Sequence, residues 1–324
     1  MSAKPVLIDN LQYANFSPKV FEQMRAGGVD AVHVTITYHE SFREMILNLE
    51  QWNRWFEVHG DLIFKGTTAA DVRLAQETGR TAIFFGFQNP SPIEDDIGLV
   101  EICHQLGIRF MQLTYNNQSL LATGCYEDDD TGLTRMGKQV VAEMNRVGMV
   151  IDMSHSADRS TLEAIEYSTR PIAITHANPD WWHPALRNKS DEVLRALTDE
   201  GGMLGFSVYP HHLAGGSDCT LDSFCQMIAE SASRYGAENL GIGTDLCQDQ
   251  PDSVVEWMRS IPSTLTRLKI DVPNASAEVV DALHSLVAKT TTLAELDAME
   301  GKTSTRLNVL QLNGTEKVKR VSLS

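Results

Sequence analysis

The chain has 324 residues, 42% of them hydrophobic, which is ordinary for a soluble globular protein, and its formal net charge is −16. Such an acidic chain is a poor partner for nucleic acid or for an anionic membrane surface. No apolar run approaches the roughly 18 residues of a transmembrane helix, and the N-terminus lacks the apolar segment of a signal peptide. Five scattered cysteines without a CxxC pair predict free thiols in a reducing cytoplasm.

Eight short apolar runs alternate with amphipathic stretches along the chain. The runs cover residues 5–9, 29–37, 81–87, 108–115, 148–154, 171–176, 201–209 and 240–246. The stretches with helical spacing include 41–59, 133–148, 157–168, 190–201 and 221–236. Apolar strands that lead into helices are typical of a parallel sheet buried on both faces.

Eight such units predict an α/β fold, a closed (β/α)₈ TIM barrel. An open doubly wound sheet is the structural alternative, but no GxGxxG or GxxxxGK[ST] loop supports nucleotide binding in such a sheet. No linker rich in Pro, Ser or Gly divides the chain, so residues 1–324 are predicted to form one domain. After about residue 262 the pattern predicts a helical segment, and then a polar, frayed end.

Polar residues gather where the predicted strands end, which is where barrels carry their chemistry. Two adjacent strands end in His155 and His176, and the last strand ends in Asp245. Two imidazoles can share one metal ion at about 2.0–2.1 Å. A facing aspartate can take a proton from activated water and pass it to a leaving amine. The three residues therefore predict a hydrolytic site at this end of the barrel.

Other polar residues are better explained by structure than by chemistry. His33 lies in the middle of a predicted strand and is interpreted as a packing residue. His211 and His212 lie in a longer loop and are expected at the surface. The acidic run at 127–130 lacks the glycine and spacing of a calcium loop, so we expect a solvated charge run.

At these strand ends the sequence resembles the membrane (renal-type) dipeptidase family of the amidohydrolase superfamily, over about residues 5–310. The firmest segments are GLTRMGKQVVAEMNRVGMVIDMSHSADRS, PIAITHANPDWWHPALRNKSDEVLRAL and ENLGIGTDLCQD. The resemblance implies a metal-dependent hydrolase barrel with a two-metal centre, usually zinc. Such enzymes hydrolyse dipeptides, including those with a D-residue at the C-terminal position.

Carried over by position, the resemblance implies roles for four residues. His155 and His176 match the two histidines of the second metal. Asp245 matches the catalytic aspartate after the last strand. Arg187 matches the arginine that binds the substrate carboxylate, a role that suits its planar fork of donors.

The sequence departs from the family at other ligand positions. The family's first strand ends in Asp-Gly-His-Asn-Asp, whose histidine and last aspartate bind the first metal, but here Leu11 and Tyr13 stand in those two places. Gln88 replaces a glutamate that bridges both metals, and Tyr115 replaces a histidine that binds the substrate. Anionic ligands offset the charge of two close cations, so their loss makes a second ion hard to hold.

We therefore expect at most one zinc ion, held by His155 and His176, with Gln88, Asp245 or water completing its shell. The alternative is that the protein binds no metal. The leading functional hypothesis is hydrolysis of a small amide or related C–N bond in a substrate that carries a carboxylate. In it, Asp245 serves as base and then acid, while Tyr115 and Gln88 orient the carbonyl oxygen.

Three other functions remain open on the same barrel: a metal-free lyase or proton-transfer enzyme, a true zinc dipeptidase, and a non-catalytic small-molecule binding protein. The expected partner is a small-molecule substrate, with neither nucleic acid nor membrane. A homodimer is an expectation from the family alone.

Overall fold

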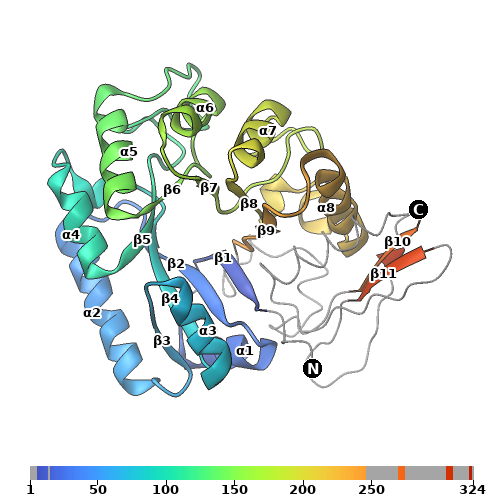
Figure 1. Cartoon of the computed structure of the whole chain (residues 1–324), viewed down its shortest axis with the longest axis horizontal. Helices are drawn as coiled ribbons and strands as arrows, with labels where there is room; N and C mark the ends of the chain where they lie inside the picture. The colour runs from blue at the N-terminus through green and yellow to red at the C-terminus, as the bar shows by residue number, and fades with distance from the viewer. Residues whose placement is uncertain (1–5, 14, 246–268, 274–303, 309–320, 323–324) are drawn as a thin grey trace.

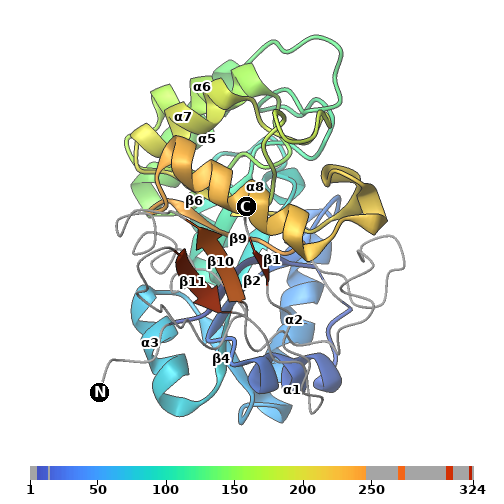
Figure 2. The ribbon, with the colours of Figure 1, turned by 90° about the vertical axis from the view of Figure 1, so that its right-hand side faces the viewer.

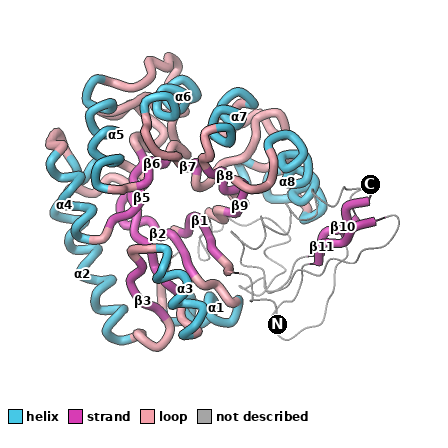
Figure 3. Tube along the Cα trace, in the orientation of Figure 1, coloured by secondary structure: helices cyan, strands magenta, loops and turns pink. Residues whose placement is uncertain are grey.

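A parallel sheet curls into a ring that is surrounded by helices (Figures 1 and 3). This computed structural model describes residues 6–13 and 15–245, together with three short strands in the tail. The strands of the ring are, in spatial order, β1 (Ile8–Gln12), β2 (Ala31–Thr37), β4 (Thr81–Phe87), β5 (Ile108–Gln112), β6 (Val150–Asp152), β7 (Ala173–Ile174), β8 (Met203–Phe206) and β9 (Leu240–Ile242). The barrel fold expected from the eight apolar runs is thus confirmed: seven runs contain one strand of the ring each, and the first run, 5–9, overlaps only the beginning of β1.

Helices follow the strands and cover the outside of the ring. They are α1 (Pro18–Gly27), α2 (Phe42–Val58), α3 (Ala69–Thr78), α4 (Gly98–Leu106), α5 (Arg135–Val147), α6 (Asp158–Tyr167), α7 (Asp191–Asp199) and α8 (Leu221–Tyr235). Turned by 90°, the molecule shows α5, α6 and α7 on the opposite side from α1 and α3 (Figure 2). In the part of the chain that the structure describes, no helix has the length and apolarity needed to cross a bilayer.

One strand was not predicted. β3 (Ile63–Gly66) runs parallel to the first half of β4 and pairs with no other strand of the described sheet. Further along β4, the place beside it is taken by β5. Four residues, half of them only partly buried, leave too short a hydrophobic pattern for sequence analysis to separate from the preceding helix.

The helices begin where hydroxyl side chains cap them. In α2, α5, α7 and α8 the residue before the helix accepts a hydrogen bond from a first-turn backbone N–H; these residues are Ser41, Thr134, Ser190 and Thr220. Such a cap satisfies one of the donors that a helix start leaves without a partner. Behind the caps, apolar faces pack on the barrel, as with the fully buried Val140, Val141 and Met144 of α5.

The ends of the strand path are joined through a side chain. The described ladder runs from β1 to β9 without pairing those two strands to each other. Instead, the fully buried Asp9 accepts hydrogen bonds from the backbone N–H of Thr244 at 2.8 Å and from its hydroxyl at 2.6 Å. The N–H of Asp245 donates to the carbonyl of Leu11 at 3.1 Å. Closure of the barrel therefore also fixes the backbone that carries Asp245.

A glycine in β4 makes room for a histidine inside the barrel. His33 of β2 is buried and stacks on Phe110 with ring centroids 4.3 Å apart, which confirms the packing role predicted for it. A Cβ added to Gly86 would lie 1.9 Å from His33 Nε2. We expect Gly86→Ala to lower the free energy of unfolding by about 1–3 kcal/mol, because overpacked cores must shift.

Urea denaturation of a double-mutant cycle tests this expectation. In a His33→Ala background the added methyl group has space, so Gly86→Ala should cost clearly less there than in the wild type. Equal costs in both backgrounds would show that the histidine is not the reason for the glycine.

Most of the tail lies outside the described residues, including nearly all of the helical segment and frayed end predicted after about residue 262. The described tail residues form a small sheet in the order β11 (Ser304–Asn308), β10 (Lys269–Pro273), β12 (Val321–Ser322). Figure 1 shows β10 and β11 outside the ring of barrel strands. The single-domain organisation of residues 1–324 stays a prediction.

Candidate active site

A cavity of about 500 Å³ opens at the C-terminal ends of the barrel strands. Its described lining is Tyr13, Asn15, Tyr38, His39, Gln88, Tyr115, Asn116, Tyr126, His155, Arg187, Tyr209, His212 and Asp245. Most of these residues follow a predicted strand end, so the structure brings the candidate residues together, except that His176 is fully buried and is not among the lining residues. Leu11 is fully buried and is not among the lining residues, so of the two first-strand residues that the sequence predicts to replace metal ligands only Tyr13 lines the cavity.

The hydrogen bonds of His155 determine which of its ring nitrogens faces the cavity. Its Nδ1 lies 2.6 Å from the amide oxygen of Asn116, so Nδ1 donates and Nε2 carries the lone pair. Asn116 reaches this position with φ at 63°, a left-handed conformation that is uncommon outside glycine. Backbone strain of this kind is concentrated at functional sites.

His176 is held in the same tautomer by a different route. The hydroxyl of Thr175 donates to the carboxylate of Asp152 at 2.6 Å, so it accepts from Nδ1 of His176 at 2.8 Å. The lone pair of His176 Nε2 therefore points towards His155, whose Nε2 lies 3.1 Å away. Burial, and then the positive charge of Arg187, holds the pKa of each imidazole well below its ordinary value, so both rings are neutral.

Three neutral donor atoms converge at this point. Besides the two Nε2 atoms, the amide oxygen of Gln88 lies 2.9 Å from His155 Nε2. Two nitrogens that each lie about 2.0–2.1 Å from a shared ion are separated by a distance similar to the 3.1 Å found here between the two Nε2 atoms. The donor set therefore fits one borderline cation such as zinc. Among the described residues there is no cluster of three His, Cys, Asp or Glu side chains that could hold a metal. The set does not fit a pair of ions.

Arg187 is a buried cation beside these imidazoles. Its guanidinium donates to the carbonyl of Ser154, to the carbonyl of His176 at 3.2 Å and to Nε2 of His155 at 3.3 Å. It is only 2% exposed, and no carboxylate of the described chain lies within ion-pair distance of it. A desolvated charge without a counter-ion is costly, and the cavity it lines can supply one in a ligand.

Asp245 faces the same cavity. Burial raises the pKa of its carboxyl to about 7; Arg187 opposes this rise, Asp9 adds to it, and a hydrogen bond from Ser207 opposes it. Its φ of 56° is again left-handed. A carboxyl with a pKa close to neutrality exists in both protonation states at working pH, which is what an acid–base group requires.

The turn that carries His155 is held at three successive carbonyl groups. Arg187 donates to the carbonyl of Ser154, the backbone N–H of Cys125 to that of His155 at 3.0 Å, and the ammonium of Lys189 to that of Ser156. Lys189 is 1% exposed, and burial lowers its pKa to about 8. Sequence reasoning missed this lysine, because nothing in the letters around it separates a buried lysine from one at the start of a surface helix.

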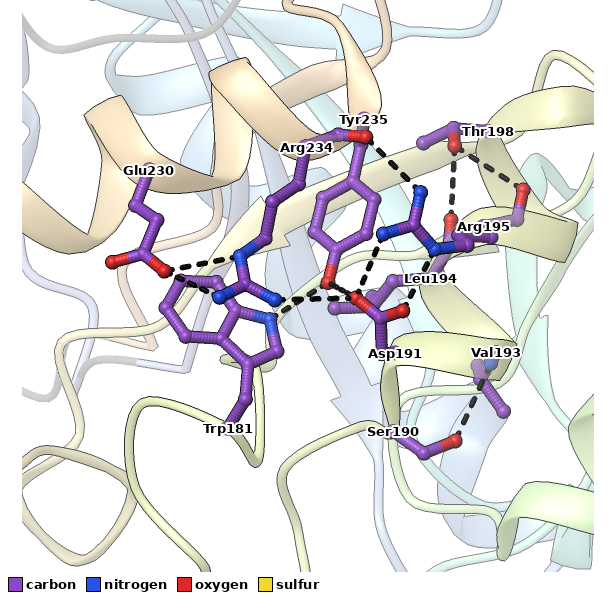
Figure 4. A network of polar contacts seen from close by, with 10 residues as sticks. All are labelled: Trp181, Ser190, Asp191, Val193, Leu194, Arg195, Thr198, Glu230, Arg234 and Tyr235. Carbon is purple, nitrogen blue, oxygen red and sulfur yellow. Dashed lines mark hydrogen bonds and ion pairs between the residues drawn. The ribbon is translucent and has the colours of Figure 1, made fainter.

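The loop between β7 and α7, which carries Arg187, is anchored to α8 (Figure 4). The hydroxyl of Tyr235 accepts from the indole N–H of Trp181 at 2.7 Å and donates to Asp191 at 2.7 Å. The guanidinium of Arg234 lies 4.1 Å from the centre of the Trp181 ring. These contacts hold the loop on both sides of Arg187, at Trp181 and at the start of α7, so Arg187 is held in place before any ligand arrives.

Two expectations about other polar residues have different outcomes. His211 is exposed as predicted, but His212 is not a surface residue. It is 5% exposed and lines the cavity, because the short 3₁₀ turn Pro210–His212 folds its ring inward beside Tyr209.

In the acidic run 127–130, Asp130 is bonded to the N-terminus of α6, accepting from the backbone N–H groups of Arg159 and Ser160. This residue has a capping role.

Comparison with known proteins identifies the family. Residues 10–287 match the model of the membrane dipeptidase family, peptidase family M19. The dipeptidase tcpJ of Claviceps purpurea is 26% identical over 219 residues, which are 67% of this chain and 50% of that protein. The chain spans about half the length of the curated relatives it matches.

Solved structures show the same fold. An amidohydrolase from Pseudomonas aeruginosa superposes with a TM-score of 0.74 at 38% identity, covering 76% of this chain and 75% of that chain. A metallopeptidase from Rhodobacter sphaeroides, bound to a phosphinate mimic of the dipeptide L-Ala-D-Ala, superposes with a TM-score of 0.66 at 17% identity, covering 80% and 91% of the two chains. The second likeness concerns the fold alone.

Proposed function

This chain belongs to the membrane dipeptidase family, peptidase family M19, and we propose that it hydrolyses a small amide, of dipeptide type, whose leaving part ends in a carboxylate. The observation that carries the proposal is the pairing of two groups in one cavity. Arg187 offers a buried, preorganised positive charge, and Asp245 offers a carboxyl that titrates close to neutral pH. One binds an anion and the other moves a proton.

The residues divide the work of hydrolysis between them. Arg187 binds the substrate carboxylate and so sets the position of the amide bond in the cavity. Asp245 takes a proton from the attacking water and returns it to the departing amine nitrogen. Gln88 and Tyr115, which follow β4 and β5, orient the carbonyl oxygen. A metal ion held by His155, His176 and Gln88 would lower the pKa of water and polarise the carbonyl.

We propose further that at most one ion is bound. The converging donor atoms of His155, His176 and Gln88 are all uncharged, and such a set offsets none of the charge of a second divalent cation. The first-strand positions support the same view, since Leu11 is buried away from the cavity and Tyr13 presents a phenol.

Metal content tests this part of the proposal. Elemental analysis after mild purification and zinc loading should find one equivalent of zinc per chain, and His155→Ala should lose it. A matched His211→Ala variant, changed at the surface, should keep it. Two equivalents in the wild type would contradict the single-ion proposal, and no metal under any loading condition would leave only the metal-free enzyme and the non-catalytic binding protein.

One observation favours that alternative as a second candidate function. Arg187 donates to the same lone pair of His155 that a metal would need, at 3.3 Å. If the guanidinium keeps this place, the cavity suits proton transfer or lyase chemistry on a small carboxylate without metal. If the wild type cleaves no peptide bond but exchanges a substrate proton for deuterium, this second function is assigned.

Two sequence expectations belong to the same proposal: a homodimer and a cytoplasmic location. The described cysteines are all free and buried, which is in keeping with a reducing compartment. Light scattering at several concentrations and fractionation of the source cells test them.

A further inference from the structure

The active-site cavity is unusually rich in tyrosine. The chain has seven tyrosines, and five of them line this one cavity: Tyr13, Tyr38, Tyr115, Tyr126 and Tyr209. They follow four different barrel strands, so they gather in space although they are scattered along the sequence. Tyrosine offers a flat, rigid and weakly polar surface at a small cost in side-chain entropy, and it is common where aromatic groups are bound.

Part of this set forms a continuous row of rings across the mouth of the barrel. Tyr13 and Tyr38 meet edge to face, with centroids 6.2 Å apart and an interplanar angle of 89°. Tyr38 and Tyr115 do the same at 5.6 Å and 79°. Tyr115 then stacks on His155 at 4.3 Å and 30°. The row therefore leads from the first strand to the imidazole at the centre of the site.

The cavity has more room than a dipeptide of small residues would fill. An engineered cavity of about 150 Å³ holds a benzene molecule, and this one measures about 500 Å³. The proposed function already assigns its charged groups, because Arg187 binds the substrate carboxylate and Asp245 acts at the scissile bond. The remaining volume is bounded largely by rings, and a neighbouring groove of about 680 Å³ shares Tyr115 and His39 with it.

We propose that the site selects substrates whose acyl part carries a planar aromatic or heteroaromatic ring, seated against Tyr13, Tyr38 and Tyr115. This inference rests on the proposed hydrolase function and names the substrate class of that site. A neutral ring continues the edge-to-face row that the tyrosines begin. A cationic group would instead meet the positive field of Arg187 in the same cavity.

Tyr38 is the specificity-determining residue in this arrangement. It lies in the middle of the row, contacts the rings on either side, and takes no part in proton transfer or carboxylate binding. Removing its ring should therefore change which acyl group is preferred. Each aromatic contact is worth about 2- to 10-fold in binding, so two such contacts give roughly a 5- to 100-fold preference.

The test compares kcat/KM for L-Phe-D-Ala and L-Leu-D-Ala, which share the carboxylate and the leaving group. The wild type should prefer the phenylalanyl substrate by at least about fivefold. Tyr38→Leu should lower the ratio by about 2- to 10-fold, which is the share of one contact. Tyr38→Phe should keep it, and the matched control Tyr167→Leu, at a half-exposed position on α6, should also keep it. Because each ratio is measured within one variant, partial misfolding cancels.

A wild-type ratio near or below one would overturn the proposal while leaving the hydrolase function intact. If no dipeptide is cleaved, the hydrolase function fails, and calorimetric titration with the same two dipeptides still decides: tighter binding of the phenylalanyl compound supports the ring site, and equal affinities overturn it. Tighter binding of a trimethyllysyl dipeptide than of the phenylalanyl one would assign the rings to a cation and would likewise overturn the proposal.

Discussion

Asp245→Asn is expected to lower kcat by about 10²- to 10⁴-fold, the usual contribution of a positioned acid–base group. Asparagine keeps the size of the side chain and a hydrogen-bonding oxygen, but it cannot accept a proton from water. The backbone should stay in place, because the N–H of residue 245 and the carbonyl of Leu11 are untouched by the change. Steady-state kinetics on a dipeptide, with circular dichroism as a folding check, measure the effect.

The pH profile supplies the control for this prediction. Because the pKa of Asp245 is raised to about 7, kcat/KM should rise tenfold per pH unit below about pH 7 and level off above it. The charge of Asp9 contributes to that raised pKa, so Asp9→Asn should move the acidic limb to lower pH. A limb that stays in place in Asp9→Asn, or that survives in Asp245→Asn, would assign the titration to another group.

The same carboxyl predicts a pH dependence of stability, with a definite sign. In the unfolded chain it has an ordinary pKa near 3.8, whereas in the fold the pKa is about 7. Between these values the unfolded state loses its proton first, so unfolding becomes easier as pH rises from about 4 to about 7 and the contribution is constant above that. The difference in unfolding free energy between the wild type and Asp245→Asn should show this trend.

The alternation of apolar runs and amphipathic stretches was enough to predict the barrel, since each strand is buried on both faces and each helix carries a regular apolar face. β3 escaped because a four-residue strand has too little pattern of its own. The closure of the barrel through Asp9 and Thr244 also could not be predicted, because it joins residues 235 positions apart through a side chain instead of a ladder.

The candidate site was accessible from the sequence where residues follow strands, because parallel strands bring their C-terminal ends to one face. Orientation and burial were not accessible. Leu11, which was predicted to replace a metal ligand, is buried in the core, whereas His212, which was expected at the surface, lines the cavity. Tyr126 and Lys189 come from long loops, whose path depends on contacts that no local pattern encodes.

Arg187→Met is expected to lower kcat/KM for a dipeptide with a free carboxylate by about 30-fold or more, because truncating one partner of a buried charged pair costs about 2–5 kcal/mol. Methionine retains an unbranched apolar stem but has no donor. The same loss should appear when the wild type is given the C-terminal amide of the dipeptide, which lacks the negative charge. The substitution removes the positive charge of the protein and the amide removes the negative charge of the substrate, so both abolish the same ion pair.

The decisive quantity is therefore the ratio of kcat/KM for the acid and the amide, measured within each variant. Arg187 also donates to the carbonyls of Ser154 and His176, so its replacement loosens the turn that holds His155 and lowers the activity on every substrate. That general damage cancels in the ratio, whereas recognition of the carboxylate does not. A wild-type ratio of about 30 or more that falls to about one in Arg187→Met would assign the carboxylate to this guanidinium. A ratio that is unchanged by the substitution would show that Arg187 serves only to support the histidine turn, and that another group of the cavity binds the anion.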